Sequence, residues 1–154
     1  MVKKWRVSNN IMEKLESREV ELWDLLTQVF RNGRRKLETE LQKISMKPTE
    51  LKVLHTISTE GATQMNSLAD TLGITGPWIT GIVEELASEG YVKKTRSKTD
   101  RRIISLSITA AGVRKLSEGM QIYNELLAEA LSVLDSDRVQ DLKDILELLN
   151  GSLK

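Results

Sequence analysis

The sequence contains no cysteine and a single histidine among its 154 residues. The absence of cysteine excludes a disulfide framework and any metal site built on thiolates. A catalytic triad or a zinc site would need histidines or cysteines that the chain lacks. The sequence also holds no P-loop, no glycine-rich dinucleotide fingerprint and no nucleophile elbow. We therefore expect a protein that is not an enzyme, with no catalytic residue, no bound metal and no cofactor.

Long hydrophobic runs are missing as well. None approaches the ~18 residues that a membrane-spanning helix needs, and no apolar segment of a signal peptide follows the basic residues 1–6. We expect no membrane partner and a cytoplasmic location. The 40% hydrophobic and 29% charged residues are typical of a globular protein, and the length suits one domain with helical extensions.

The net charge of +1 conceals an uneven distribution along the chain. Residues 93–117 contain eight basic residues and one acidic residue. Residues 48–92 contain one basic and six acidic residues, and residues 118–154 contain three basic and eight acidic residues. Positive charge concentrated in one short central segment is the electrostatic footprint of a protein that contacts a polyanion.

Apolar residues at helical spacing predict long helices at both ends of the chain. The first covers residues 11–45, and about 30 residues of helix would be ~45 Å long, more than a compact domain of this size needs. Pro48 then begins a second helix that ends at Gly61. A long helix capped by Thr109 and a last helix after the break at 135–137 close the chain. These amphipathic terminal helices predict a homodimer; the alternative is that they only pack on each other.

The centre of the chain predicts a helix-turn-helix. A short helix within residues 63–73 ends at Gly73 as its C-cap, and a tight turn leads into a second helix with Thr75 as N-cap and Pro77 in its first turn. Gly90 ends this second helix. Its inner stripe comprises Ile79, Ile82, Val83 and Leu86. A short helix, a tight turn and a second helix are the signature of this motif.

The second helix of such a motif places its N-terminal residues at base edges in the major groove of DNA. Its outward face carries Gly76, Pro77, Trp78, Thr80, Gly81 and Glu84. Thr80 can hydrogen-bond to bases or phosphate, and Gly81 lets the backbone approach closely. Trp78 either packs on the preceding helix or makes apolar contact with a thymine methyl group or deoxyribose. Because this face has no Arg, Asn or Gln, we predict modest base specificity, supplemented by readout of DNA shape.

Two β-prone segments, 91–96 and 103–108, predict a hairpin directly after the helix-turn-helix. Residues 93–102 contain six basic residues and one acidic residue. A charge run is often only a solvated surface, but after a helix-turn-helix it predicts a DNA-binding wing. An arginine at the tip suits the negative potential of a narrow minor groove. We expect Asp100 to hold Arg102 or Arg96 in position.

These motifs together resemble the MarR (multiple antibiotic resistance regulator) family of winged-helix repressors. The resemblance spans residues 65–112 and is carried by Leu68-Ala69, Leu72-Gly73-Ile74-Thr75, Ile79 to Leu86, Glu89-Gly90-Tyr91-Val92, Asp100-Arg101-Arg102 and Leu106 to Gly112. It implies a mainly α fold with a small β-hairpin wing. In this fold a winged helix-turn-helix, residues 47–109, is flanked by dimerisation helices in residues 1–46 and 110–154.

The resemblance also implies an obligate homodimer on a pseudo-palindromic operator, with half-sites about one helical turn (~34 Å) apart. The family's wing arginine falls on Arg102, with Asp100 as its acidic partner. The sequence departs from the family at Gly76-Pro77-Trp78, a segment that is usually richer in Ser, Gln and Arg. The DNA contacts that we expect are Ser67, Thr75, Gly76, Pro77, Trp78, Thr80, Gly81, Lys94, Arg96, Lys98, Asp100, Arg101 and Arg102.

Many members of this family are released from DNA by small aromatic acids or phenols bound beside the dimerisation helices. Others sense oxidants through cysteine, which this chain lacks. The candidate residues for an aromatic or phenolic effector are Trp23, Phe30 and His55, with Arg18 or Arg31 as the partner of its carboxylate. The alternative is that the aromatic side chains are core residues and the arginines are surface residues.

The sequence thus predicts a sequence-specific regulator, a repressor, that binds double-stranded DNA as a homodimer. One alternative is an architectural DNA-binding protein of weak sequence specificity. The small number of residues able to read bases on the second helix of the motif favours this alternative. Another is a winged-helix module whose wing meets an acidic protein partner.

Overall fold

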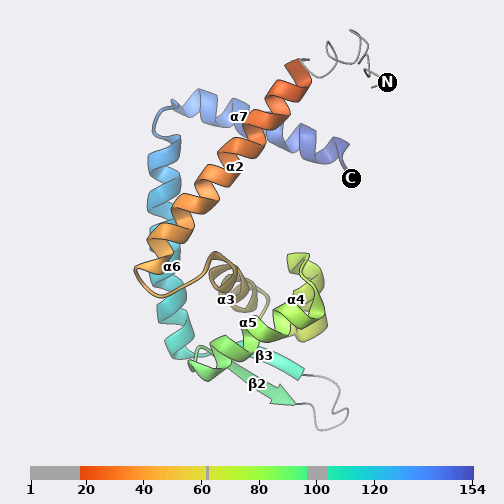
Figure 1. The fold of residues 1–154 in the computed structure, drawn as a ribbon, viewed down its shortest axis with the longest axis vertical. Coiled ribbons are helices and arrows are strands. Elements are labelled where there is room, and N and C mark those ends of the chain that lie inside the picture. Colours follow the sequence, from red (N-terminus) through yellow and green to blue (C-terminus); the bar gives the residue numbers. More distant parts are fainter. Residues whose placement is uncertain (1–17, 62, 97–103) are drawn as a thin grey trace, which may run out of the picture. The chain divides into compact units, whose positions relative to one another are not determined.

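The computed structural model describes residues 18–61, 63–96 and 104–154, and the chain divides into two compact units, residues 1–36 and 37–154. The described residues form six helices and three strands, in the order α2, α3, β1, α4, α5, β2, β3, α6 and α7 (Figure 1). The first unit contains most of α2 (Arg18–Gln42), and the last turns of that helix belong to the second unit. The predicted fold class, mainly helical with a small β wing, is confirmed.

Helix α2 ends three residues before the predicted boundary at residue 45. Ser45 has a φ of 52°, and the N–H of Met46 donates to the carbonyl oxygen of Leu41 at 3.1 Å. A left-handed residue followed by such a bond is a common way to terminate a helix, although glycine usually occupies the position. The predicted start of this helix, at residues 11–17, lies outside the described residues. In the first unit the large apolar side chains of α2 are exposed, except Leu26, which is half-buried.

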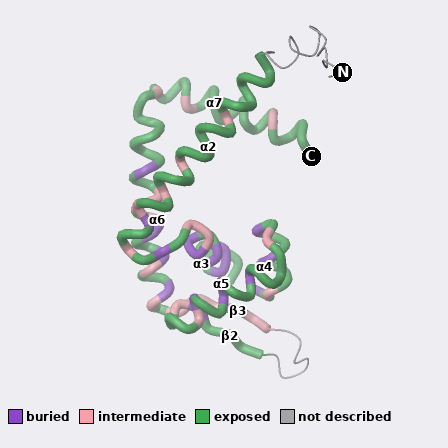
Figure 2. Tube along the Cα trace, viewed as in Figure 1, coloured by how far each residue is buried: buried purple, intermediate pink, exposed green. Residues whose placement is uncertain are grey.

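The core of the second unit is formed where α3 (Pro48–Glu60), α4 (Met65–Leu72) and α5 (Gly76–Ser88) pack together. Figure 2 shows buried residues gathered on these helices. The predicted inner stripe of α5 is buried, with Ile79, Ile82, Val83 and Leu86 in the cluster. The predicted boundaries at Pro48 and Gly73 are also confirmed, Gly73 having the left-handed φ of 62° that a C-cap requires.

The wing is part of a three-stranded antiparallel sheet, not of an isolated hairpin. Strands β2 (Val92–Arg96) and β3 (Ile104–Ile108) pair as predicted. A further strand, β1 (Thr63–Gln64), pairs with the other edge of β3, so the order is β1-β3-β2. The sequence alone predicts that residues 63–64 belong to the following helix, because a two-residue strand is too short to show the alternation that identifies strands.

Helix α6 (Ala110–Leu131) leaves the sheet and carries the chain to α7 (Ser136–Ser152). The predicted cap is confirmed, since Thr109 Oγ1 accepts a hydrogen bond from the N–H of Gly112 at 3.0 Å. Gly112 packs so tightly that an added Cβ would lie 2.2 Å from the carbonyl oxygen of Tyr91. By contrast, α7 contains no buried residue (Figure 2). Most of its large apolar side chains are exposed, whereas Val139 and Leu149 are half-buried.

Candidate nucleic-acid interface

The face of α5 predicted to meet DNA is open to solvent in the structure. Its expected contacts Thr75, Gly76, Pro77, Trp78, Thr80 and Gly81 are all exposed, and so is Ser67 on α4. Thr75 occupies the N-cap position with extended backbone, but its side chain makes no cap hydrogen bond. Because the apolar stripe on the other side of α5 packs into the core, the first turns of α5 present one continuous exposed surface.

Trp78 is the most prominent side chain on this surface. It is 54% exposed, so it is not a core residue, and the indole is available to a partner. Thr80 directs its hydroxyl to its own helix, where Oγ1 donates to the carbonyl oxygen of Gly76 at 2.8 Å. The hydroxyl keeps its lone pairs as acceptors, while its proton is engaged within the helix.

The wing strand β2 is joined to α5 by an ion pair. Lys94 lies directly opposite Leu106 in the sheet, so its side chain leaves β2 on the same side as the buried Leu106 and Val92. From there Lys94 Nζ reaches Glu84 Oε2 on α5 at 2.5 Å. Arg96, also exposed, follows two residues later on that side of the strand. The remaining wing candidates, Lys98, Asp100, Arg101 and Arg102, lie outside the described residues.

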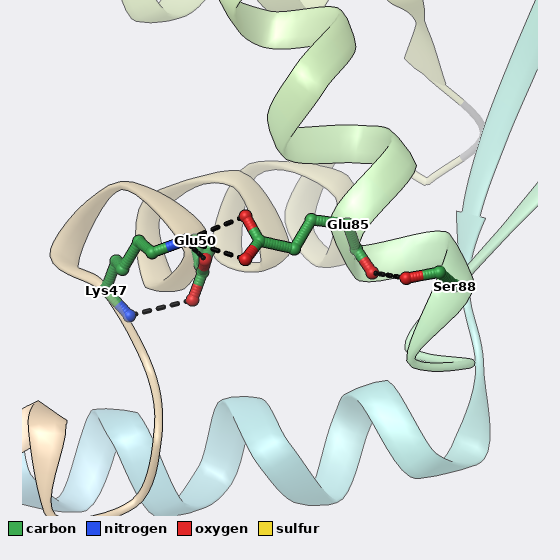
Figure 3. Close-up of polar contacts among 4 residues, drawn as sticks. All are labelled: Lys47, Glu50, Glu85 and Ser88. Carbon is green, nitrogen blue, oxygen red and sulfur yellow. Dashed lines mark hydrogen bonds and ion pairs between the residues drawn. The ribbon is translucent and has the colours of Figure 1, made fainter.

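A second group of charges fixes the C-terminal half of α5 to the start of α3 (Figure 3). Lys47 Nζ contacts both carboxylate oxygens of Glu85, at 2.7 and 2.8 Å, and Oε1 of Glu50 at 3.0 Å. Glu50 is buried and also accepts a hydrogen bond from the backbone N–H of Lys47 at 2.8 Å. The hydrogen bond to Glu85, followed by that to Glu50, raises the pKa of Lys47 above its ordinary value of 10.5.

Sequence reasoning missed both ion pairs. It assigned Glu84 only to the outward face of α5, and it gave no role to Lys47 or Glu85. Lys47 and Glu85 are 38 residues apart, so no helical periodicity links them. The one local signal was the acidic residue three positions after Lys47, because a Glu at the third position of a helix often accepts from the N-cap N–H. The pair with Glu85 had no such signal.

The candidate effector residues lie in different units. Arg18, Trp23, Phe30 and Arg31 are on α2 in the first unit, where all four are exposed. His55 is on α3 in the second unit and is exposed as well. The aromatic side chains of α2 are therefore not core residues within the single chain. Their role in binding an effector stays a prediction.

The arrangement of α4, α5 and the β2–β3 hairpin defines a winged-helix protein. Residues 46–104 match the model of the MarR family. The HTH-type transcriptional regulator YpoP of Bacillus subtilis is 31% identical over 105 residues, covering 68% of this chain and 71% of that protein. YfiV of the same organism, also an HTH-type transcriptional regulator, is 26% identical over 141 residues, covering 91% of this chain and 88% of that protein.

The fold also matches solved structures. A mutant MarR from E. coli, complexed with operator DNA, superposes with a TM-score of 0.75 at 22% identity, covering 84% of this chain and 94% of that one. The chain belongs to the MarR family. It is accordingly a DNA-binding transcriptional regulator and not an enzyme. Within the described residues, no helix combines the length and apolar character needed to cross a membrane.

Proposed function

We propose that the protein is a repressor that binds a pseudo-palindromic operator as a homodimer, with α5 in the major groove and the wing at the neighbouring minor groove. The observation that carries this proposal is the joint placement of an exposed α5 face and a basic strand. Lys94 ties the strand to the helix through Glu84, so both elements can meet one stretch of DNA together. Sequence-specific binding to a DNA duplex needs groups that contact bases and groups that contact phosphates, held in a fixed position relative to each other.

The homodimer is supported by the apolar side chains that the single chain leaves exposed. On α7 these are Leu142, Ile145, Leu146 and Leu148, and on α2 they are Val20, Leu22, Trp23, Leu25, Val29 and Phe30. Apolar groups this numerous on soluble chains usually mark interfaces between proteins. A second copy of the chain is the partner that also explains a palindromic operator, since the two-fold axis of the dimer would match that of the DNA.

The DNA-binding role is tested by titrating the purified protein against the fragment upstream of its own gene and against a scrambled duplex, each at two salt concentrations. The proposal expects protection of a palindrome, a large ratio of specific to non-specific affinity, and affinity that falls steeply with salt. Equal affinities for the two duplexes would favour the architectural alternative. That alternative has one observation in its favour: the outward face of α5 carries no Arg, Asn or Gln. Absence of binding at low salt would contradict both.

We also propose that a small aromatic acid or phenol releases the protein from DNA by binding near α2. The exposed Trp23 and Phe30 supply apolar contact, and Arg18 or Arg31 supplies a cation for a carboxylate. A thermal-shift screen with salicylate-like acids tests this role. A ligand that raises the melting temperature should also weaken operator binding, and a compound series that does neither would remove the proposal.

A further inference from the structure

The N-terminal half of α5 offers DNA an unusual set of contacts. Among residues Gly76–Gly81, Pro77, Trp78 and Thr80 have exposed side chains, and Trp78 is the only large one of the three. The hydroxyl proton of Thr80 is engaged by the carbonyl oxygen of Gly76. What remains for a base edge is the apolar rings of Trp78 and Pro77, the methyl group of Thr80 and the lone pairs of its hydroxyl oxygen.

The polar side chains further along α5 are already engaged. Glu84 pairs with Lys94, and Glu85 pairs with Lys47. Both are carboxylates, which in the major groove could accept a hydrogen bond only from the amino group of cytosine or adenine, and each already contacts an ammonium group through at least one oxygen. This leaves Trp78 as the side chain on α5 with the largest exposed surface for discriminating between bases.

We propose that Trp78 determines operator specificity by contacting the C5 methyl group of a thymine in each half-site. The inference rests on the proposed function and names the chemistry that α5 reads. In the major groove thymine alone carries an apolar group, so an apolar side chain can distinguish it from the other bases. Trp78 is in the first turn of α5, and the first turn of a recognition helix is the part that reaches base edges.

Charge complementarity places DNA, not an apolar protein partner, against this indole. The adjacent strand β2 carries Lys93, Lys94 and Arg96, which suit a phosphate backbone and would be costly to bury against a hydrophobic surface. Contact of the indole with deoxyribose would contribute affinity but no preference for sequence, because every nucleotide has the same sugar. The two contacts are therefore separable by experiment.

The experiment uses the full-length protein and duplexes selected by it from a random pool. Every thymine of the selected half-site is then replaced in turn by deoxyuracil, which removes the methyl group and keeps all hydrogen-bonding groups. At one position per half-site we expect about a fourfold rise in Kd, the factor that corresponds to burial of one methylene-sized group. Substitution in both half-sites should multiply the two effects, and thymines elsewhere in the site should be insensitive.

Two variants assign the effect to the indole. Trp78→Ala should bind thymine and deoxyuracil duplexes equally at that position, and selection with this variant should lose the preference for thymine there. Trp78→Phe keeps an apolar ring without the N–H donor and should retain the discrimination. Because Trp78 is exposed, both variants should melt near the temperature of the wild type, which is measured alongside.

Each outcome decides the inference. An unchanged deoxyuracil effect in Trp78→Ala would mean that another group or the shape of the DNA senses the methyl group. Loss of discrimination in Trp78→Phe as well as in Trp78→Ala would show that the methyl contact needs the full indole ring, because deoxyuracil keeps every hydrogen-bonding group of thymine, and it would support the proposal. The first result overturns the proposal while leaving a sequence-specific regulator intact. Failure to select any discrete sequence would instead contradict the proposed function, and with it this inference.

Discussion

Lys94 on the wing strand and Glu84 on α5 form an ion pair, with 2.5 Å between Nζ and Oε2. The two residues belong to the two elements that a winged-helix protein presents to DNA. The pair has opposing consequences, because it holds the wing strand against the helix while it occupies a cation that could otherwise meet a phosphate. It also brings a carboxylate to the surface that we propose faces DNA, where negative charge is unfavourable.

Replacement of Glu84 by Gln should therefore increase affinity for DNA and reduce specificity. The variant removes a charge that phosphates repel and releases Lys94 to neutralise a phosphate. We expect several-fold tighter binding to a scrambled duplex at low salt. The slope of log K against log salt should steepen by about 1 for each subunit. Fluorescence anisotropy over a salt series measures both quantities.

Glu89→Gln is the matched control, because it changes net charge equally from the C-cap of the same helix. Affinity and salt slope should change much less in this variant. If the two variants behave alike, the effect of Glu84 is only that of overall charge, and the pair with Lys94 has no specific part in DNA binding.

Lys47→Met should destabilise the fold by about 1 kcal/mol at neutral pH, a modest value because solvent screens the exposed ammonium group. The variant leaves the buried Glu50 without its cation. The raised pKa of Lys47 sets the pH dependence. The charge of Lys47 contributes its full stabilisation at pH values below the ordinary pKa of 10.5. This contribution is lost as the pH rises through the higher pKa that Lys47 has in the folded protein.

The difference in the free energy of unfolding between wild type and Lys47→Met should thus stay constant near neutral pH and shrink in strongly alkaline solution. Urea unfolding at a series of pH values measures it. Lys43→Met is the control, since Lys43, just after the end of α2, pairs at 2.6 Å with Glu40 three residues earlier and joins no separate elements. A stability difference for Lys47→Met that does not depend on pH would contradict the role of its charge.

Gly81→Ala should increase the stability of the fold while weakening the binding of operator DNA. A Cβ at this position meets no atom within 4 Å, so alanine should stabilise α5 by about 0.5–1 kcal/mol through its higher helix propensity. If DNA approaches the backbone there, the added methyl group should weaken operator binding by about tenfold. Gly151→Ala on α7, which also meets nothing within 4 Å, should leave operator affinity unchanged. A Gly81→Ala protein that binds normally would place DNA away from this residue.

Arg102→Ala should weaken operator binding by at least ~1 kcal/mol, because a guanidinium in a narrow minor groove makes strong electrostatic contacts. Arg102 lies outside the described residues, so its role rests on the basic run and on the resemblance of the Asp-Arg-Arg segment. Arg138→Ala, which removes the same charge from the first turn of α7, is the control. An unchanged Kd for Arg102→Ala would refute its place in the wing contact.

Ile145→Glu should convert the proposed homodimer into monomers, because it places a charge within the exposed apolar stripe of α7. Sedimentation should show half the wild-type mass, and operator affinity should fall since each monomer meets one half-site. Gln140→Glu adds the same charge on the polar side of α7 and should leave the mass unchanged. A dimeric Ile145→Glu protein would place the interface elsewhere.

Local features of this protein could be predicted from its sequence. Pro48 begins α3, Gly73 ends α4 with a φ of 62°, and Thr109 caps α6. Each depends on the backbone within a few residues, where a missing N–H, a missing Cβ or a nearby hydroxyl decides the conformation. Helical spacing likewise identified which face of α5 is buried, and the charge run located the wing.

Other features were decided only by the tertiary structure. Strand β1 exists because β3 offers it an edge to pair with, and Ser45 ends α2 without the glycine that usually marks such a position. The pairs Lys94–Glu84 and Lys47–Glu85 join separate elements. No residue pattern specifies such contacts, because charged side chains on two exposed surfaces can meet many partners. The packing of the helices and the sheet determines which carboxylate lies within reach of each lysine.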